Sequence, residues 1–333
     1  MSDQLVKELG EQGLLKLIQP FCPVEVIGDD GAILDVKSGH KLVVTTDVLV
    51  DEVHFSDRTT APFDVGWRSA AANLSDLAAM GANPLGITVG LSLPGTTPIT
   101  WVQKLYRGIS GCLQQFATPI VGGDVTRSSV ITVAITAFGE VLPQRVITRS
   151  SARPGDVILI TGYHGLSRAG LELLLDPSLG ENLSLPEKAF LTKAHQRPQP
   201  RLDAISKLRK IAPDAVIAGM DSSDGLGDAI AQICRCSSVG ATIDLEAIGR
   251  SPILDKLPSD CSLSQWILNG GEDFELVLSL SPRLAQELLS ELGEGAAIIG
   301  HIDRGARILL REAETVTEIK VADFTAEFQH FST

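Results

Sequence analysis

The stretch PFDVGWRSAAANLSDLAAMGANPLGITVGLSL, residues 62–93, indicates the fold class of this chain. Its first part, 62–80, is rich in alanine and predicts a helix that ends at Gly81 as a C-cap. The part that follows predicts a strand over 87–93. A helix that passes directly into a strand is typical of mixed α/β structure.

Helices and strands continue to alternate on both sides of this stretch. In the first half we expect helices at 4–19 and 100–116, a strand at 41–46 that ends at Asp47, and a strand at 130–141. In the second half we expect helices at 165–175, 201–210, 225–237 and 282–292 and strands at 157–161, 215–219, 241–245, 274–280 and 297–302. A segment with four prolines, between the first two helices of the second half, is interpreted as a loop-rich insert.

A polar segment with a Pro-Gly turn, residues 149–156, separates the two halves. We therefore place a domain boundary near 142–155. The expected architecture is α/β (α+β) with two domains, 1–145 and 146–333.

The composition excludes several classes of protein. The 333 residues include 28 Lys and Arg against 41 Asp and Glu, and the resulting net charge of −13 disfavours a nucleic-acid partner. No apolar run approaches the roughly 18–20 residues that a membrane span needs, and the first residues do not resemble a signal peptide. The five cysteines have scattered spacings, which favours free thiols in a reducing cytoplasm over a disulfide framework or a zinc site.

Several aspartates stand beside Gly, Ser or Thr, most of them at the ends of apolar runs. They are Asp29, Asp30, Asp47, Asp76, Asp124, Asp221, Asp224 and Asp273. If carboxylates from several such edges converge, they repel one another unless a hard cation binds, and Mg²⁺ is the usual cation when phosphates share the site. The sequence therefore predicts a magnesium and phosphate site.

Each of these motifs also has an ordinary structural interpretation. Asp-Gly pairs form turns, Asp76 could lie on a solvated helix face, and the segment 221–225 could be a helix N-cap. That interpretation must account for every motif independently. The common phosphate-binding signatures, a P-loop, a protein-kinase set or GxGxxG in a βαβ unit, are absent from the sequence.

As an ordered set, the motifs resemble those of the thiamine-monophosphate kinase family, in the superfamily of aminoimidazole ribonucleotide synthetase and selenophosphate synthetase. They are GDDGA at 28–32, TTDVLVDEVHF at 45–55, NLSDLAAMGANP at 73–84, GGDVTR at 122–127, RSSARPGD at 149–156, MDSSDGL at 220–226 and GGEDFEL at 270–276. The resemblance extends from about residue 26 to EFQHF at 327–331. One departure is Ser151, where the family pattern has Gly.

The resemblance implies an N-terminal α/β domain that dimerises through its sheet and a C-terminal α/β domain. It implies ATP and several Mg²⁺ ions bound between them, with transfer of the γ-phosphoryl group to thiamine monophosphate to give thiamine diphosphate. The protein would then be a homodimer.

The resemblance also assigns roles to single positions. The metal ligands would be Asp30, Thr45, Thr46, Asp47, Asp76, Asp124, Asp221 and Asp224. ATP would contact Tyr106, Gly123, Asp124, Arg149 and Ser223, and thiamine monophosphate would contact His54, Glu272 and Phe328. No catalytic base is assigned, because the acceptor is already a phosphate oxygen anion.

Three of these residues also have ordinary structural alternatives. His54 could be a packed or solvated histidine, Phe328 could only pack the C-terminal segment, and Tyr106 could belong to the core.

Two other functions compete with the kinase. One is a synthetase of the same superfamily; a selenophosphate synthetase would carry a reactive Cys and a Lys in a Gly-rich N-terminal segment, and nothing before Gly28 matches this. The other is a non-catalytic nucleotide- or metal-binding protein of the same fold, which the presence of an aspartate in every motif disfavours.

Overall fold

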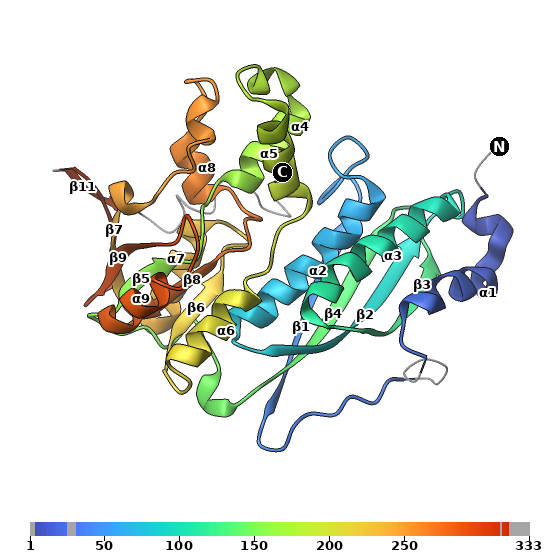
Figure 1. The fold of residues 1–333 in the computed structure, drawn as a ribbon, viewed down its shortest axis with the longest axis horizontal. Coiled ribbons are helices and arrows are strands. Elements are labelled where there is room, and N and C mark those ends of the chain that lie inside the picture. The colour runs from blue at the N-terminus through green and yellow to red at the C-terminus, as the bar shows by residue number, and fades with distance from the viewer. Residues whose placement is uncertain (1–3, 25–30, 314, 320–333) are drawn as a thin grey trace. The chain divides into compact units, whose positions relative to one another are not determined.

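The computed structural model describes residues 4–24, 31–313 and 315–319 of the chain (Figure 1). The chain divides into two compact units. The first comprises Met1–Leu77 and Ala82–Val141, and the second comprises Ala78–Gly81 and Leu142–Thr333. Each unit has its own sheet, which confirms the expected mixed α/β class.

The first unit is built on a four-stranded sheet. Its strands are β1 (Lys41–Val50), β2 (Asn83–Leu93), β3 (Ile120–Arg127) and β4 (Thr132–Val141), and its helices are α1 (Val6–Ile18), α2 (Pro62–Ala79) and α3 (Ile99–Leu113). The strand order is β1-β4-β2-β3. This order makes β1 and β3 the two edges of the sheet. Strands β2 and β3 pair in parallel, and the other neighbours are antiparallel.

One face of this sheet is covered by α2 and α3, which lie across it (Figure 1). Alternate residues of the central strands, such as Val89 and Ile135, are buried on this face. The two helices approach closely at Gly66 and Gly108, where a Cβ atom would come within 2.0 Å of a main-chain carbonyl oxygen of the other helix. We call the covered side the helix face of the sheet.

The other side of the first sheet, which we call the open face, carries exposed apolar residues. On β1 these are Leu42, Val44 and Val48, with 51%, 53% and 46% of their surface exposed. They alternate with Val43, Thr45 and Asp47, which lie on the helix face, because successive residues of a strand point to opposite sides.

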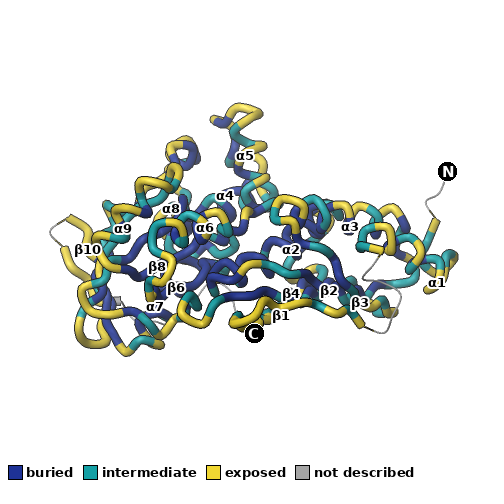
Figure 2. Tube along the Cα trace, turned by 60° about the horizontal axis from the view of Figure 1, so that its bottom comes forward, coloured by how far each residue is buried: buried dark blue, intermediate teal, exposed yellow. Residues whose placement is uncertain are grey.

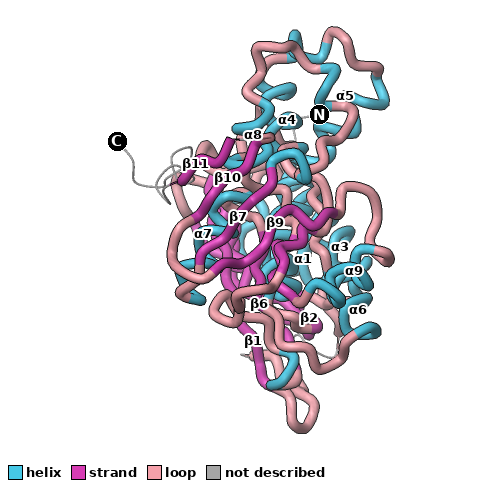
Figure 3. Tube along the Cα trace, turned by 90° about the vertical axis from the view of Figure 1, so that its left-hand side faces the viewer, coloured by secondary structure: helices cyan, strands magenta, loops and turns pink. Residues whose placement is uncertain are grey.

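The second unit contains a seven-stranded sheet with the order β11-β10-β7-β9-β5-β8-β6. These strands are β5 (Val157–Ile160), β6 (Ala218–Asp221), β7 (Gly240–Asp244), β8 (Leu276–Leu280), β9 (Ala297–Asp303), β10 (Ile308–Glu312) and β11 (Thr315–Ile319). Strands β11, β10, β7 and β9 run side by side in Figure 3. The helices are α4 (Leu166–Leu175), α5 (Leu185–Gln196), α6 (Leu202–Ile211), α7 (Leu226–Ser237), α8 (Leu263–Asn269) and α9 (Pro282–Leu289). Short 3-10 helices of the chain lie at Gln19–Phe21, Gln114–Phe116, Pro143–Arg145, Pro177–Gly180, Leu245–Ala247 and Leu254–Lys256.

Both faces of the second sheet are buried at β5. Ile158 and Ile160 of β5 join one hydrophobic cluster together with residues of α4 and α7, whereas Leu159 joins another with residues of α6 and α9. Strands β6 and β8 are therefore buried along their whole length (Figure 2, dark blue). This unit has the layered packing of a sheet between helices.

The structure departs from the sequence-based expectations at several elements. Helix α8 and strands β10 and β11 lie in segments for which no helix or strand was expected. The strand that was expected to end at Asp47 continues to Val50, which places Asp47 inside β1. The segment around Gly122 and Gly123, for which no strand was expected, is part of strand β3. The expected loop-rich insert contains helix α5, which has Pro186 in its first turn, where a missing N–H costs no hydrogen bond.

Among the described residues, no helix combines the length and the apolar character that a membrane span requires. The five cysteines are all free thiols, as the sequence predicted.

Candidate active site

Two of the predicted metal ligands are in direct contact in the first unit. The Thr45 hydroxyl of β1 donates a hydrogen bond to the Asp76 carboxylate of α2. Asp47 lies on the same face of β1 as Thr45, since their partners on β4, Ile135 and Ala137, are both fully buried under the helices. The structure therefore gathers three oxygen-bearing side chains of the predicted set on the helix face of β1.

Thr46 lies on the other side of the same strand. Its Oγ1 atom is 2.9 Å from Oγ1 of Thr136 on β4. The adjacent threonines thus point to opposite faces, and only the Thr45 hydroxyl is directed at Asp76.

Gly123 and Asp124 belong to β3, at the opposite edge of the sheet from Asp47. Asp47 pairs with Ile135, Ile135 with Val89, and Val89 with Gly123, so one row of residues crosses all four strands. Three interstrand spacings of about 4.8 Å put the two ends of this row about 14 Å apart. One ion with Mg–O distances of about 2.1 Å cannot be bound by both Asp47 and Asp124 of the same chain.

Glycine is required at position 123 by this sheet. A Cβ atom there would lie 2.1 Å from the carbonyl oxygen of Val89. The close approach of the two parallel strands fixes the position of Asp124, which is exposed at the edge.

His54 is held by a tight turn that follows β1. Its main-chain N–H donates to the Val50 carbonyl, and its Nδ1 accepts a hydrogen bond of 3.1 Å from the Val50 N–H. The neutral ring therefore carries its proton on Nε2. Glu52 of this turn adopts a φ of 63°, a left-handed conformation that is uncommon for a residue with a side chain. The turn also contributes Asp51 and Phe55 to a cavity of about 220 Å³.

Tyr106 lies in the core of the first unit. Only 2% of its surface is exposed, and its ring centroid is 5.6 Å from that of Phe21. Burial raises the pKa of its hydroxyl. This environment favours the alternative in which Tyr106 packs the core over a contact with nucleotide.

Two predicted motifs interlock in the second unit. The Glu272 N–H donates a hydrogen bond of 2.7 Å to the Ser223 carbonyl, and the Ser223 hydroxyl donates to the Asp221 carboxylate at 3.0 Å. Gly271 permits this approach, because a Cβ atom there would lie 2.5 Å from the Ser223 carbonyl oxygen. A predicted metal ligand, a predicted ATP contact and a predicted substrate contact are thus joined by hydrogen bonds.

The other predicted residues of the second unit lie near these motifs or on the segment before β5. Asp224, the next residue after Ser223, is exposed. Arg149 donates from Nη1 to Oε1 of Gln232 on α7 at 2.6 Å, and its main-chain carbonyl accepts a hydrogen bond from Ser237.

The loop 270–276 is held by contacts that the sequence did not predict, although Asp273 is one of the aspartates that it singled out. Asp273 accepts hydrogen bonds from the N–H groups of Gly165 and Ser167, at 2.6 and 2.8 Å, and so caps the start of α4. Desolvation raises the pKa of Asp273 to about 7, although these two N–H groups oppose the shift.

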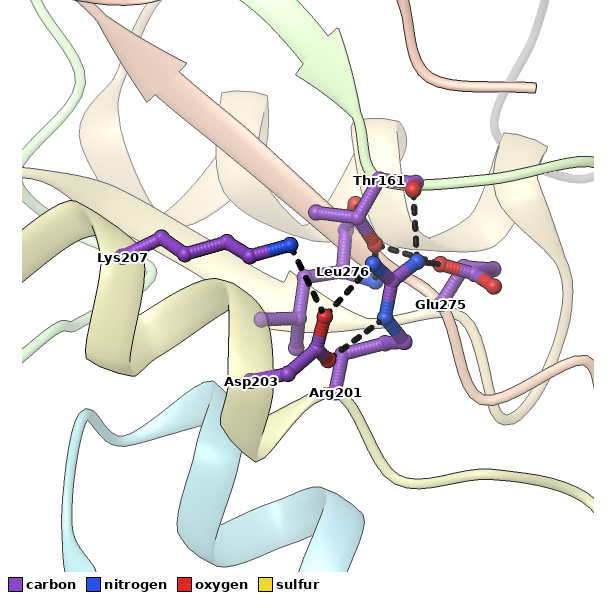
Figure 4. Close-up of polar contacts among 6 residues, drawn as sticks. All are labelled: Thr161, Arg201, Asp203, Lys207, Glu275 and Leu276. Carbon is purple, nitrogen blue, oxygen red and sulfur yellow. Dashed lines mark hydrogen bonds and ion pairs between the residues drawn. The ribbon is translucent and has the colours of Figure 1, made fainter. Parts of the chain in front are cut away.

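A polar network at the end of the same loop includes Glu275. Its carboxylate accepts hydrogen bonds of 2.5 Å from the Thr161 hydroxyl and from Nη1 of Arg201, whose Nε pairs with Asp203 at 2.9 Å (Figure 4). The network anchors the end of the loop where it enters β8. Its members could not be inferred from the sequence, because residues 161, 201 and 275 belong to segments that only the fold brings together.

Asp30 and Phe328 lie outside the described residues. Within the part of the chain that the structure describes, no three His, Cys, Asp or Glu side chains gather as the ligands of one metal ion. The convergence of the predicted carboxylates thus remains a prediction.

Two family models match consecutive parts of the chain. The AIR synthase related protein N-terminal domain matches residues 28–141, and the C-terminal domain of the same proteins matches residues 153–311.

Several relatives named thiamine-monophosphate kinase are similar to this chain over most or all of its length. The chain is 51% identical to a thiamine-monophosphate kinase from Synechococcus elongatus over 337 aligned positions that cover 100% of both proteins. It is 34% identical to the thiamine-monophosphate kinase of Escherichia coli, over 87% of this chain and 88% of that protein.

Solved structures agree with these similarities. AaThiL in complex with AMPPCP and TMP matches with a TM-score of 0.73 and 31% identity, over 96% of this chain and 99% of that chain. The thiamine-monophosphate kinase from Stenotrophomonas maltophilia matches with a TM-score of 0.77 and 31% identity, over 89% and 95%. The hydrogenase maturation protein HypE in complex with ATP, at 18% identity and a TM-score of 0.76 over 95% and 97%, shares the fold.

Proposed function

Because the chain belongs to the thiamine-monophosphate kinase family of AIR synthase related proteins, we propose that it phosphorylates thiamine monophosphate with ATP, giving thiamine diphosphate and ADP. The observation that carries this proposal is the 51% identity to a thiamine-monophosphate kinase over the full length of both chains. Within that family the reaction is the last step in making thiamine diphosphate.

The donor set fits Mg²⁺, which prefers oxygen ligands. Thr45, Asp47 and Asp76 offer hydroxyl and carboxylate oxygens on one face of β1 and α2, and Asp221 offers a buried carboxylate in the second unit. We assign several Mg²⁺ ions, and not one, to the predicted set of ligands, which comprises Asp30, Thr45, Thr46, Asp47, Asp76, Asp124, Asp221 and Asp224. Bound Mg²⁺ would neutralise the phosphate charges that the two substrates bring to the site.

The remaining assignments divide between the two substrates. ATP is assigned to Gly123, Asp124, Arg149 and Ser223, and thiamine monophosphate to His54, Glu272 and Phe328. Arg149 supplies a fixed positive charge for phosphate oxygens. The Nε2–H of His54 and the carboxylate of Glu272 supply a donor and an acceptor for the second substrate.

The chain itself needs to supply little covalent chemistry. An acceptor phosphate oxygen is already an anion, so in-line transfer of the γ-phosphoryl group requires alignment rather than a strong base. The hydrogen bonds that join Ser223, Asp221 and Glu272 support such alignment, because they link residues assigned to donor and acceptor.

We further propose that the enzyme is a homodimer whose open faces pack together. Leu42, Val44 and Val48 give this face an exposed apolar surface, which association with a second copy would cover. If the two sheets close into one barrel, edge β1 of one chain meets edge β3 of its partner. Asp47 of one chain and Asp124 of its partner would then lie along the same seam, although Asp47 and Gly123 are about 14 Å apart across a single sheet.

We place the enzyme in the cytoplasm. The support is the set of free thiols, which a reducing compartment preserves, and the dependence of the proposed reaction on ATP.

The experiment that tests the function is an ADP-release assay with Mg²⁺ and ATP and one of three acceptors: thiamine monophosphate, thiamine or none. We expect ADP release only with thiamine monophosphate, because free thiamine offers a hydroxyl that needs a base. Equal rates with thiamine, or the same rate without an acceptor, would contradict the proposal.

A further inference from the structure

A buried histidine of α5 lies next to the carboxylate that we assign to the acceptor substrate. Nδ1 of His195 is 3.2 Å from the Ser167 hydroxyl oxygen and 3.6 Å from Oε2 of Glu272. His195 is 3% exposed and Ser167 is 1% exposed, whereas the Glu272 side chain remains 35% exposed. Glu272 is thus backed by protein on the side of His195 and still accessible to a ligand.

The position of His195 is fixed by close packing of two helices. Gly170 of α4 faces α5, and a Cβ atom there would lie 2.1 Å from the Leu191 carbonyl oxygen and 3.0 Å from the Cβ of His195. Only a glycine lets α5 come near enough to α4 for the His195 ring to reach Ser167 and Glu272.

The carboxylate of Glu272 favours a proton on Nδ1 of His195. Nδ1 faces two oxygen atoms, one of them a carboxylate oxygen, and an unprotonated Nδ1 would direct its lone pair at that negative charge. A proton on Nδ1 is attracted to the carboxylate instead. His195 therefore presents an N–H to the side of Glu272 that faces the helices.

The neighbouring residue completes a closed set of contacts. Asp273 accepts the Ser167 N–H at 2.8 Å, and the Ser167 hydroxyl contacts His195, which in turn faces Glu272. Glu272 itself has a φ of 65°, so its backbone is in an uncommon conformation that its surroundings must maintain.

We propose that His195 is a positioning residue for the acceptor substrate: its imidazole, with Nδ1 3.6 Å from Oε2, supports the Glu272 carboxylate in the orientation in which it contacts thiamine monophosphate. The inference rests on the proposed function, in which Glu272 binds that substrate. It adds His195 of α5 to the residues that position the acceptor substrate.

The test compares two substitutions at His195. His195→Leu keeps an apolar volume and removes the N–H, whereas His195→Asn keeps an N–H donor close to the position of Nδ1. We expect His195→Leu to raise the KM for thiamine monophosphate about tenfold and to leave the KM for ATP within about twofold, as expected for the loss of an electrostatic contact with a charged group. For His195→Asn we expect the KM for thiamine monophosphate and the KM for ATP to stay within about threefold of the values of the unsubstituted enzyme. His301→Leu, on β9 of the same unit and paired with Asp303, is the control and should change neither KM.

A double-mutant cycle separates positioning from general stability. In a Glu272→Gln background, His195→Leu should change the KM for thiamine monophosphate by less than about twofold, because the carboxylate through which it acts is gone. Equal effects of His195→Leu in both backgrounds, or an unchanged KM in the single variant, would overturn the proposal. If His195→Leu does not fold, Ser167→Ala replaces it in the same cycle with an expected increase in this KM of about threefold, because it removes the hydroxyl group that lies 3.2 Å from Nδ1 of His195.

Failure of this inference differs from failure of the proposed function. An unsubstituted enzyme without acceptor-dependent ADP release would refute the function. An active enzyme with an additive cycle would refute only the role of His195.

Discussion

Asp47 and Gly123 occupy the two ends of one row of residues across the four-stranded sheet. The row runs from Asp47 through Ile135 and Val89 to Gly123. Asp124, the next residue after Gly123, is therefore at the far edge of the sheet from Asp47, and each edge carries part of the proposed metal site. A second copy of the chain is the simplest source of the missing edge.

This arrangement predicts that two inactive variants restore each other. Asp47→Asn and Asp124→Asn should each lower kcat at least about 100-fold, because each removes a charge that binds Mg²⁺. After subunit exchange in an equimolar mixture, about half of the dimers are mixed, and each mixed dimer has one intact site, so activity should recover to about a quarter of the normal value. Steady-state ADP release before and after exchange measures this. Size-exclusion chromatography verifies that the exchange conditions preserve the dimer. If the subunits have exchanged and the activity of the mixture has not increased, each site uses a single chain.

A second prediction concerns the glycine pair of β3. Gly123→Ala should destabilise the protein by about 2 kcal/mol or more and raise the KM for ATP, because the added Cβ would lie 2.1 Å from the Val89 carbonyl oxygen. Gly122→Ala is the matched control, since its Cβ would meet only the Thr88 methyl group at 3.6 Å. Thermal unfolding and the KM for ATP are measured for both variants. Equal melting temperatures and equal KM values would argue against the close approach of residue 123 to the Val89 carbonyl.

A third prediction distinguishes the two threonines of β1. Removal of Mg²⁺ by EDTA should abolish turnover, and added Mg²⁺ should restore it. Thr45→Val should raise the Mg²⁺ concentration at half-maximal activity about fivefold, because the Thr45 hydroxyl contacts Asp76. Thr46→Val should change it less than about twofold, since its hydroxyl pairs with Thr136 and its main-chain oxygen remains. A larger effect at Thr46 would place the metal on the open face.

A fourth prediction concerns the pH dependence of stability. The reference pKa of an aspartate carboxyl group is 3.8. In the folded protein, desolvation raises the pKa of Asp273 to about 7. Between these values the folded state binds more protons than the unfolded state, so the contribution of Asp273 to the free energy of unfolding decreases as the pH rises from about 4 to about 7. Asp273→Asn removes this contribution, so the difference in free energy of unfolding between the unsubstituted protein and the variant should be larger at pH 5 than at pH 8. Urea unfolding at the two pH values measures it, and a difference that grows with pH would indicate a lowered pKa instead.

The sequence identified the elements whose patterns are strong. The alanine-rich helix at 62–80 and the strands at 87–93 and 130–141 lie within one to four residues of α2, β2 and β4. Helix α5 was missed because its surrounding prolines indicated a loop, although Ser184 and Glu187 form a capping box with Pro186 between them. Strand β3 was missed because two glycines are atypical of strands.

The candidate site was predictable at the level of residue identity and not at the level of arrangement. The motifs supplied Thr45, Asp76, Asp221, Ser223 and Glu272, and the structure joins them by hydrogen bonds in two groups. The separation of Asp47 from Asp124 depends on strand order, which local patterns do not encode. His195 was missed because it is one histidine in a segment whose position relative to Glu272 is set by the packing of α4 and α5.

The measurement that tests the central claim most directly follows the γ-phosphoryl group itself. The enzyme is incubated with Mg²⁺, γ-³²P-labelled ATP and thiamine monophosphate, and the products are separated and hydrolysed to locate the label. The account predicts that the label enters the terminal phosphate of thiamine diphosphate in amounts equal to the ADP formed, with none transferred to thiamine. Label released only as inorganic phosphate, or ADP formed without labelled thiamine diphosphate, would contradict it.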